Sequence, residues 1–191
     1  GMSKGAVAIV GAGIAGISAA RYLESEGFTP TVFESHSDLG GQWNFENPNS
    51  GIWPSMRTNT AEFCTKLSDV QYPQEVKIFP HHSEVLDMIR DMVVTTEIGS
   101  VLRFGAEVTR LAHDRAGYSL SWSDTDGAHT ESFDRAVVAS GRFLKPENSQ
   151  IEGDQVTFED GTVVQVDAIV IGTGFDLHLP FLSDEIRKTV D

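Results

Sequence analysis

The stretch GAGIAG, residues 11–16, most constrains what this chain can fold into, because glycines stand at its first, third and sixth positions. It directly follows the apolar run 6–10, which is short, partly β-branched and typical of a buried parallel strand. Apolar side chains then recur about every three residues from Ile14 to Leu23, which predicts a helix that ends near Gly27. Residues 31–34 read as a second strand, so we expect the strand, helix, strand unit of a parallel sheet.

The spacing of these glycines matches the fingerprint of a dinucleotide-binding turn. Gly11 permits the tight turn, Gly13 lets the backbone approach a pyrophosphate, and Gly16 lets the helix pack on the strand. Glu34 stands 23 residues after Gly11, where a carboxylate that binds a ribose 2′-hydroxyl is expected. The same carboxylate would repel a 2′-phosphate, so the pattern favours FAD or NAD over NADP. A glycine-rich turn without a ligand is the alternative.

The rest of the chain predicts one α/β domain over residues 2–191, a Rossmann-like dinucleotide-binding domain with a parallel sheet and a small antiparallel β-meander. Residues 35–80 are rich in Gly, Asn, Pro and Ser and read as loops with a helical stretch near 60–67. A helix with Ser83 as its N-cap follows. The predicted meander strands are 101–111, 118–122 and 132–138, with a hairpin turn at 160–161 and a last strand at 166–171.

Composition excludes several classes of function. The chain has 191 residues, a hydrophobic fraction of 40%, which suffices for a core, and a formal net charge of −14. An acidic chain repels phosphate backbones and anionic lipids, so neither nucleic acid nor a membrane is an expected partner. A single cysteine, Cys64, and the lack of an apolar run long enough for a bilayer lead us to expect a cytoplasmic protein.

Five short stretches are each weak evidence, but their order along the chain is specific. They are ESHSDLGGQWNF (34–45), SMRTNT (55–60), SDVQYP (68–73), VVASGRFLKP (137–146) and DAIVIGTGFDLHLPFL (167–182). Taken together they resemble the FAD domain of flavin-containing monooxygenases, in which a Gly-Gly-x-Trp element lies along the cofactor.

The resemblance implies a role for each matching residue. The pyrophosphate of FAD would lie on Gly11, Ala12, Gly13, Ile14, Ala15 and Gly16, with Glu34 on the adenosine ribose. Val108 would meet the adenine through its backbone, and Gly174 would close over the cofactor. Gln42 and Trp43 would lie beside the flavin, Thr58 and Asn59 near its reactive face, with Asn59 in the catalytic role. A packing aromatic for Trp43 and a turn residue for Asn59 are the alternatives.

The sequence also departs from the family pattern. Members carry a second glycine motif for NADPH, whereas a short loop at 143–154 stands at the usual insertion point and no second G-x-G-x-x-G occurs. We therefore expect FAD as the cofactor, with NADP doubtful, and an oxidoreductase that oxygenates a nucleophilic nitrogen or sulfur with help from a separate reductase or partner subunit. A non-catalytic FAD-binding or electron-transfer module, or a truncated remnant, is the alternative. The small-molecule substrate and the oligomeric state stay open.

Three other candidate sites are set aside. His81 and His82 lack further ligands at metal-binding spacing, so a solvated loop is expected there. Cys64 has no evident base nearby in the sequence and is expected to be a small buried apolar residue. Ser140 precedes a glycine but lacks the pattern of a hydrolase nucleophile.

Overall fold

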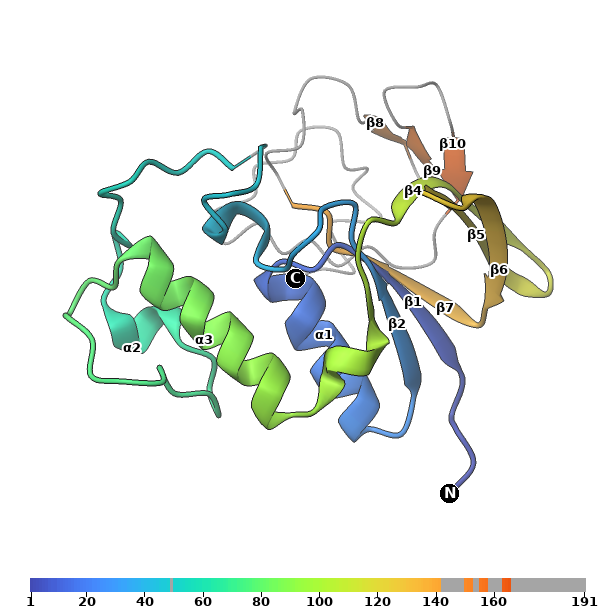
Figure 1. The fold of residues 1–191 in the computed structure, drawn as a ribbon. Coiled ribbons are helices and arrows are strands. Elements are labelled where there is room, and N and C mark those ends of the chain that lie inside the picture. The colour runs from blue at the N-terminus through green and yellow to red at the C-terminus, as the bar shows by residue number, and fades with distance from the viewer. Residues whose placement is uncertain (49, 142–149, 153–154, 158–162, 166–191) are drawn as a thin grey trace.

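The computed structural model describes residues 1–48, 50–141, 150–152, 155–157 and 163–165 (Figure 1). The fold class is α/β: a parallel sheet with helices on one face and an antiparallel meander on the other. The helices are α1 (Ile14–Ser25), α2 (Glu62–Thr65) and α3 (His82–Thr95), with the 3-10 turns η1 (Gly41–Trp43) and η2 (Ile98–Val101). The strands are β1 (Ala6–Val10), β2 (Thr29–Phe33), β3 (Leu102–Arg103), β4 (Glu107–Asp114), β5 (Gly117–Asp124), β6 (Gly127–Phe133), β7 (Arg135–Val138), β8 (Gln150–Glu152), β9 (Gln155–Thr157) and β10 (Val163–Gln165).

The central sheet has the strand order β3-β2-β1-β7, and its neighbours pair in parallel. β1 lies inside this sheet, with Val10 opposite Phe33 of β2 and opposite Val138 of β7. The carboxyl ends of these three strands therefore meet at one edge, which is where ligands bind in open α/β sheets. The strand, helix, strand prediction for residues 6–34 is confirmed.

Both faces of β1 are buried, as its nearly continuous apolar sequence predicts. Val7 and Ile9 belong to the core beneath α1 and α3, together with Ile17 and Met88. Ala8 points to the opposite side, where it joins the core beneath the meander. Figure 1 shows α1 and α3 side by side on one side of the parallel strands. Alternate side chains of β1 thus contribute to the two hydrophobic cores on opposite faces of the sheet.

The meander consists of β4, β5 and β6. Its first and third strands have other bounds than the predicted strands 101–111 and 132–138. The prediction of one strand over 101–111 is wrong, because β3 belongs to the parallel sheet and the chain turns at Gly105 before β4. There the Gly105 N–H donates to His36 O and the Ala106 N–H to Glu34 O, each at 2.9 Å. The third meander strand is therefore β6, and not 132–138.

The predicted strand 132–138 is divided at Asp134. The Asp134 N–H donates to Ala6 O at 2.9 Å, and its carboxylate accepts the Ala6 N–H at 2.7 Å. These two contacts attach the chain to the start of β1, so β7 continues in the parallel sheet beside that strand. Asp134 therefore marks the point where the chain leaves the meander sheet.

A third sheet of order β10-β9-β8 is antiparallel throughout. β8 lies within 143–154, the region that the sequence predicts as a short loop, and its Ile151 is opposite Val156 of β9. β9 and β10 pair on either side of the predicted turn at 160–161, which itself lies outside the described residues. The predicted strand 166–171 and Gly174 also lie outside them.

Candidate functional site

The glycine motif forms the turn between β1 and α1. Gly11 has φ +103°, which favours glycine, and its N–H donates to Phe33 O at 2.8 Å. A Cβ added to Gly16 would lie 1.8 Å from the carbonyl oxygen of Gly11. Two of the three glycines are thus required by contacts within the protein itself.

Gly13 differs from the other two glycines because the space around it is open. An added Cβ would have only the Cα of Gly41, 3.8 Å away, within contact distance. Gly13 is the N-cap of α1, and within the described part of the chain no side chain caps this helix and no acid occupies its first turn. The unpaired N–H groups of the first turn therefore remain available to an anion, as a pyrophosphate requires.

Glu34 lies directly after β2, next to this turn. The side chain is 6% exposed, and its carboxylate accepts the N–H of Ala12 at 3.1 Å. Its backbone is also held, because the Glu34 N–H donates to Arg103 O and its carbonyl accepts from Ala106. A buried carboxylate at the end of β2 fits the ribose of a dinucleotide, and it is well oriented before any ligand binds.

The turn η1, which carries Gln42 and Trp43, lies against the glycine motif. The Gly40 N–H donates to Ala12 O at 2.9 Å, and an added Cβ on Gly41 would lie 3.1 Å from the Cα of Gly13. Gln42 is exposed, whereas Trp43 is half-buried and packs on the core beneath the helices. The structure therefore holds the turn that carries Gln42 against the motif and gives Trp43 a packing role.

Two asparagines that sequence reasoning missed hold this turn in place. Asn44 is 2% exposed, and its amide donates to Leu39 O at 2.9 Å and to the Asp38 carboxylate at 3.1 Å. Asn47 is 8% exposed and donates to Gly41 O at 2.9 Å. The available signal was three asparagines within residues 44–49, shortly after a Gly-Gly pair, since Asn often bonds nearby backbone in turns.

Thr58 and Asn59 lie in the loop before α2. Thr58 is 6% exposed, its hydroxyl donates to Thr60 O at 2.7 Å, and its N–H donates to Pro80 O at 2.9 Å. Asn59 is exposed. Thr58 therefore orders the backbone while the Asn59 side chain lies at the surface.

Val108 lies on β4, two residues after Ala106. It is half-buried, is opposite Trp122 of β5 and packs on the core beneath the meander. Its neighbour Ala106 donates to Glu34 O. Val108 therefore lies two residues beyond the backbone contact with Glu34.

Three predictions about particular residues are wrong. His81 and His82 do not lie in a solvated loop: His81 is the N-cap of α3, in place of the predicted Ser83, and His82 is the first helical residue and 7% exposed. Cys64 is exposed and not a buried apolar residue, because the four-residue helix α2 presents it outward.

No group of three metal-binding side chains occurs among the residues that the structure describes. In that part of the chain every helix is too short or too polar to cross a bilayer.

Three pKa shifts reflect local contacts away from the glycine motif. The hydrogen bond from Arg21 lowers the pKa of Asp69, across a distance of 2.6 Å. Burial raises the pKa of Tyr72, whose hydroxyl bonds with that of Thr65. The hydrogen bond to His129, at 2.8 Å, lowers the pKa of Asp124 at the tip of the meander.

Replacing Asp124 with asparagine is expected to reduce the pH dependence of stability in acid. Because the folded pKa of Asp124 is lowered, its contribution is present above the unfolded pKa and is lost as the pH falls through the folded pKa. Urea unfolding between about pH 3 and about pH 7 should therefore show a shallower fall in midpoint for D124N. His129→Gln should show the same shallower fall in midpoint. If both variants kept the parent's pH dependence, the Asp124–His129 pair would not contribute to stability.

Comparison with known proteins agrees with this geometry. The family described as FMO-like, flavin-binding monooxygenase-like, matches residues 4–150. The chain is 30% identical to the flavin-containing monooxygenase FMO GS-OX2 of Arabidopsis thaliana, over 77% of this chain and 37% of that protein. It is also 30% identical to the flavin-containing monooxygenase ustF1 of Aspergillus flavus, over 77% of this chain and 38% of that protein.

Solved structures show the same fold. S-allyl-L-cysteine S-oxygenase from Allium sativum has a TM-score of 0.65 at 22% identity, over 95% of this chain and 65% of that one. An oxidized steroid monooxygenase bound to NADP has a TM-score of 0.62 at 23% identity, over 78% of this chain and 28% of that one. The chain spans less than two fifths of the curated relatives' length. On the match over residues 4–150, this chain belongs to the flavin-binding monooxygenase-like family.

Proposed function

We propose that this chain binds FAD and forms the cofactor-binding part of an oxidoreductase that oxygenates a nucleophilic nitrogen or sulfur atom of a small molecule. Reducing equivalents would come from a separate reductase or partner subunit, because residues 1–191 contain one such glycine motif and the proposal assigns it to FAD. When bound, the flavin supplies the redox and oxygen chemistry. The protein supplies binding and orientation.

The buried Glu34 carboxylate beside the open N-terminus of α1 is the observation that supports the proposal most. Glu34 is oriented by Ala12, and it offers a charged acceptor for ribose hydroxyls next to N–H groups that suit a pyrophosphate. The Glu34 carboxylate, for the ribose, and the N–H groups of α1, for the pyrophosphate, thus lie at the same edge of the sheet. The turn η1, which carries Gln42, lies against the glycine motif, and the family resemblance assigns Gln42 and Asn59 to the flavin half.

An absorption spectrum of the purified chain, recorded during titration with FAD, tests this proposal. We expect FAD to bind with saturation and with a shift of the flavin visible band, because η1 and the Asn59 loop replace water around the ring. NADPH added without oxygen is expected to leave the bound flavin oxidised. Lack of FAD uptake by a protein that unfolds cooperatively in urea would contradict the proposal.

A non-catalytic electron-transfer module is the second candidate function. It is favoured by the exposed Asn59, since a catalytic side chain of an oxygenating enzyme is normally shielded from water. The two functions differ when the bound flavin is reduced chemically and then exposed to air with an amine or a thioether. An oxygenated product supports the first candidate, whereas reversible oxidation without product supports the second.

A further inference from the structure

The imidazoles of His81 and His82 share one acceptor, the backbone carbonyl of Pro54. Their Nε2 atoms lie 2.8 Å and 3.1 Å from this oxygen, and the ring centroids are 4.0 Å apart. Because a carbonyl only accepts, both rings donate from Nε2. Two side chains from one helix terminus thus converge on a single point of the loop before α2.

The Nδ1 atom of His81, on the other side of the ring, contacts the first turn of α3. Its Nδ1 accepts the Ser83 N–H at 3.3 Å and lies 2.7 Å from the Ser83 hydroxyl, while the Glu84 carboxylate accepts the His81 N–H at 2.7 Å. These contacts form a capping box, which fixes both the helix terminus and the direction of the ring. His81 therefore joins the start of α3 rigidly to Pro54.

The backbone strengthens this attachment over the following residues. Arg57 forms an antiparallel bridge with His81, the His82 N–H donates to Met56 O at 3.1 Å, and the Thr58 N–H donates to Pro80 O at 2.9 Å. We call residues 54–59 the flavin-side segment, because it carries both Thr58 and Asn59. The flavin-side segment is thus bound to the terminus of α3 from Pro54 to Thr58.

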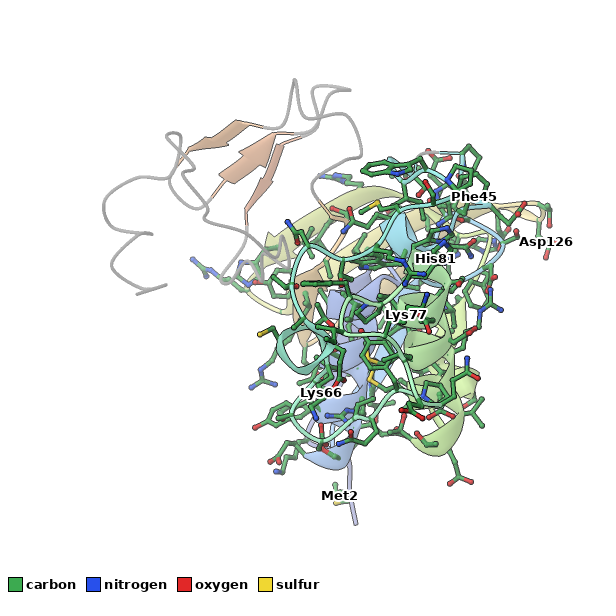
Figure 2. All side chains as sticks on the ribbon, turned by 90° about the vertical axis from the view of Figure 1, so that its left-hand side faces the viewer. Met2, Phe45, Lys66, Lys77, His81 and Asp126 are labelled. Carbon is green, nitrogen blue, oxygen red and sulfur yellow. The ribbon has the colours of Figure 1, made fainter. Side chains whose placement is uncertain are left out.

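The same helix terminus also touches the turn beside the glycine motif. The His82 ring lies 5.8 Å from that of Phe45, two residues after η1, and an added Cβ on Gly40 would lie 2.4 Å from the Leu86 side chain. Figure 2 shows His81 and Phe45 at the same end of the molecule. One rigid element, the first two turns of α3, therefore contacts both the flavin-side segment and the turn on the glycine motif.

We propose that His81 and His82 are positioning residues for the flavin half of FAD, which they serve by holding the flavin-side segment at a set distance from the glycine motif. This inference rests on the proposed function. The two imidazoles act through Pro54 and through the backbone to Thr58, and neither binds the pyrophosphate or the adenosine. Their loss should therefore weaken contacts to the flavin ring and leave contacts to ADP unchanged.

Paired titrations of the full chain with FAD and with ADP test this division. His82→Leu removes the donor at similar size and is expected to lower FAD affinity about 10-fold, the value of one hydrogen bond, while ADP affinity changes less than about twofold. Flavin fluorescence of the bound cofactor should rise, because the ring is less enclosed. His82→Gln is the matched control, since its amide nitrogen can reach the same carbonyl and should restore both readouts.

His81→Asn provides a second variant that keeps the helix capped. Asparagine is a favoured N-cap, so α3 should persist while the donor to Pro54 is lost, and the same selective loss of FAD affinity is expected. Equal losses for FAD and ADP, or unchanged FAD affinity in both variants, would overturn the positioning role. A parent chain that binds ADP but not FAD would overturn the proposed function, and this inference with it.

Discussion

Alanine at position 16 is expected to prevent FAD binding and to destabilise the chain by about 3 kcal/mol or more. The added methyl would lie 1.8 Å from the carbonyl oxygen of Gly11 and 2.9 Å from its carbonyl carbon. Both atoms are backbone, so relief requires that α1 move away from β1, which also displaces the N–H groups of its first turn. Urea unfolding measures the first effect, and titration with FAD measures the second.

Alanine at position 13 is the matched control, because the structure leaves space for its methyl group. Only the Cα of Gly41, at 3.8 Å, lies in contact range, and the backbone of Gly13 has φ −75°. We expect G13A to lose no more than about 1 kcal/mol of stability, the effect of alanine at an N-cap, yet to bind FAD at least about 10-fold more weakly. Unchanged FAD affinity in G13A would mean that no pyrophosphate approaches this turn.

Replacing Glu34 with glutamine is expected to lower ADP affinity about 10- to 100-fold. Glutamine has the same shape and its oxygen can still accept the Ala12 N–H, so the turn should persist. What is lost is the negative charge, which strengthens hydrogen bonds from ribose hydroxyls. Isothermal titration with ADP measures this loss directly.

The same variant tests the expected selection against NADP. The parent chain should bind adenosine 2′,5′-bisphosphate far more weakly than ADP, because Glu34 repels the 2′-phosphate, and E34Q should narrow this difference. Glu24→Gln makes the same change of charge at an exposed site on α1 and should leave both affinities unchanged. If E34Q kept the parent's ADP affinity, the carboxylate would have no part in the site.

Local sequence was sufficient to predict the turn and the strand, helix, strand unit that carry Gly11, Gly16 and Glu34. Gly11, Gly16 and Glu34 belong to one strand, helix, strand unit, whose geometry follows from short-range rules of turn, helix and parallel strand. The structure brings the Glu34 carboxylate to the Ala12 N–H, although 22 positions separate them in the chain. This part was predictable because a βαβ unit has one handedness and leaves few arrangements.

Strand boundaries were less predictable where one predicted strand contributes to two sheets. Residues 101–111 and 132–138 each look continuous in sequence, yet the structure divides them at Gly105 and at Asp134. Nothing local distinguishes a strand of the meander from a strand of the parallel sheet. The division is decided by partners far along the chain, Glu34 and His36 for the first and Ala6 for the second.

By itself the sequence determined the glycine turn, the carboxylate after β2 and the α/β class, because periodicity and turn chemistry act between near neighbours. Only the tertiary structure decided what His81 and His82 do. An imidazole can cap a helix, bind a metal or face water, and its role depends on which acceptor the fold brings within reach. Here that acceptor is Pro54 O, which precedes His81 by 27 residues and contacts it only once α3 has packed.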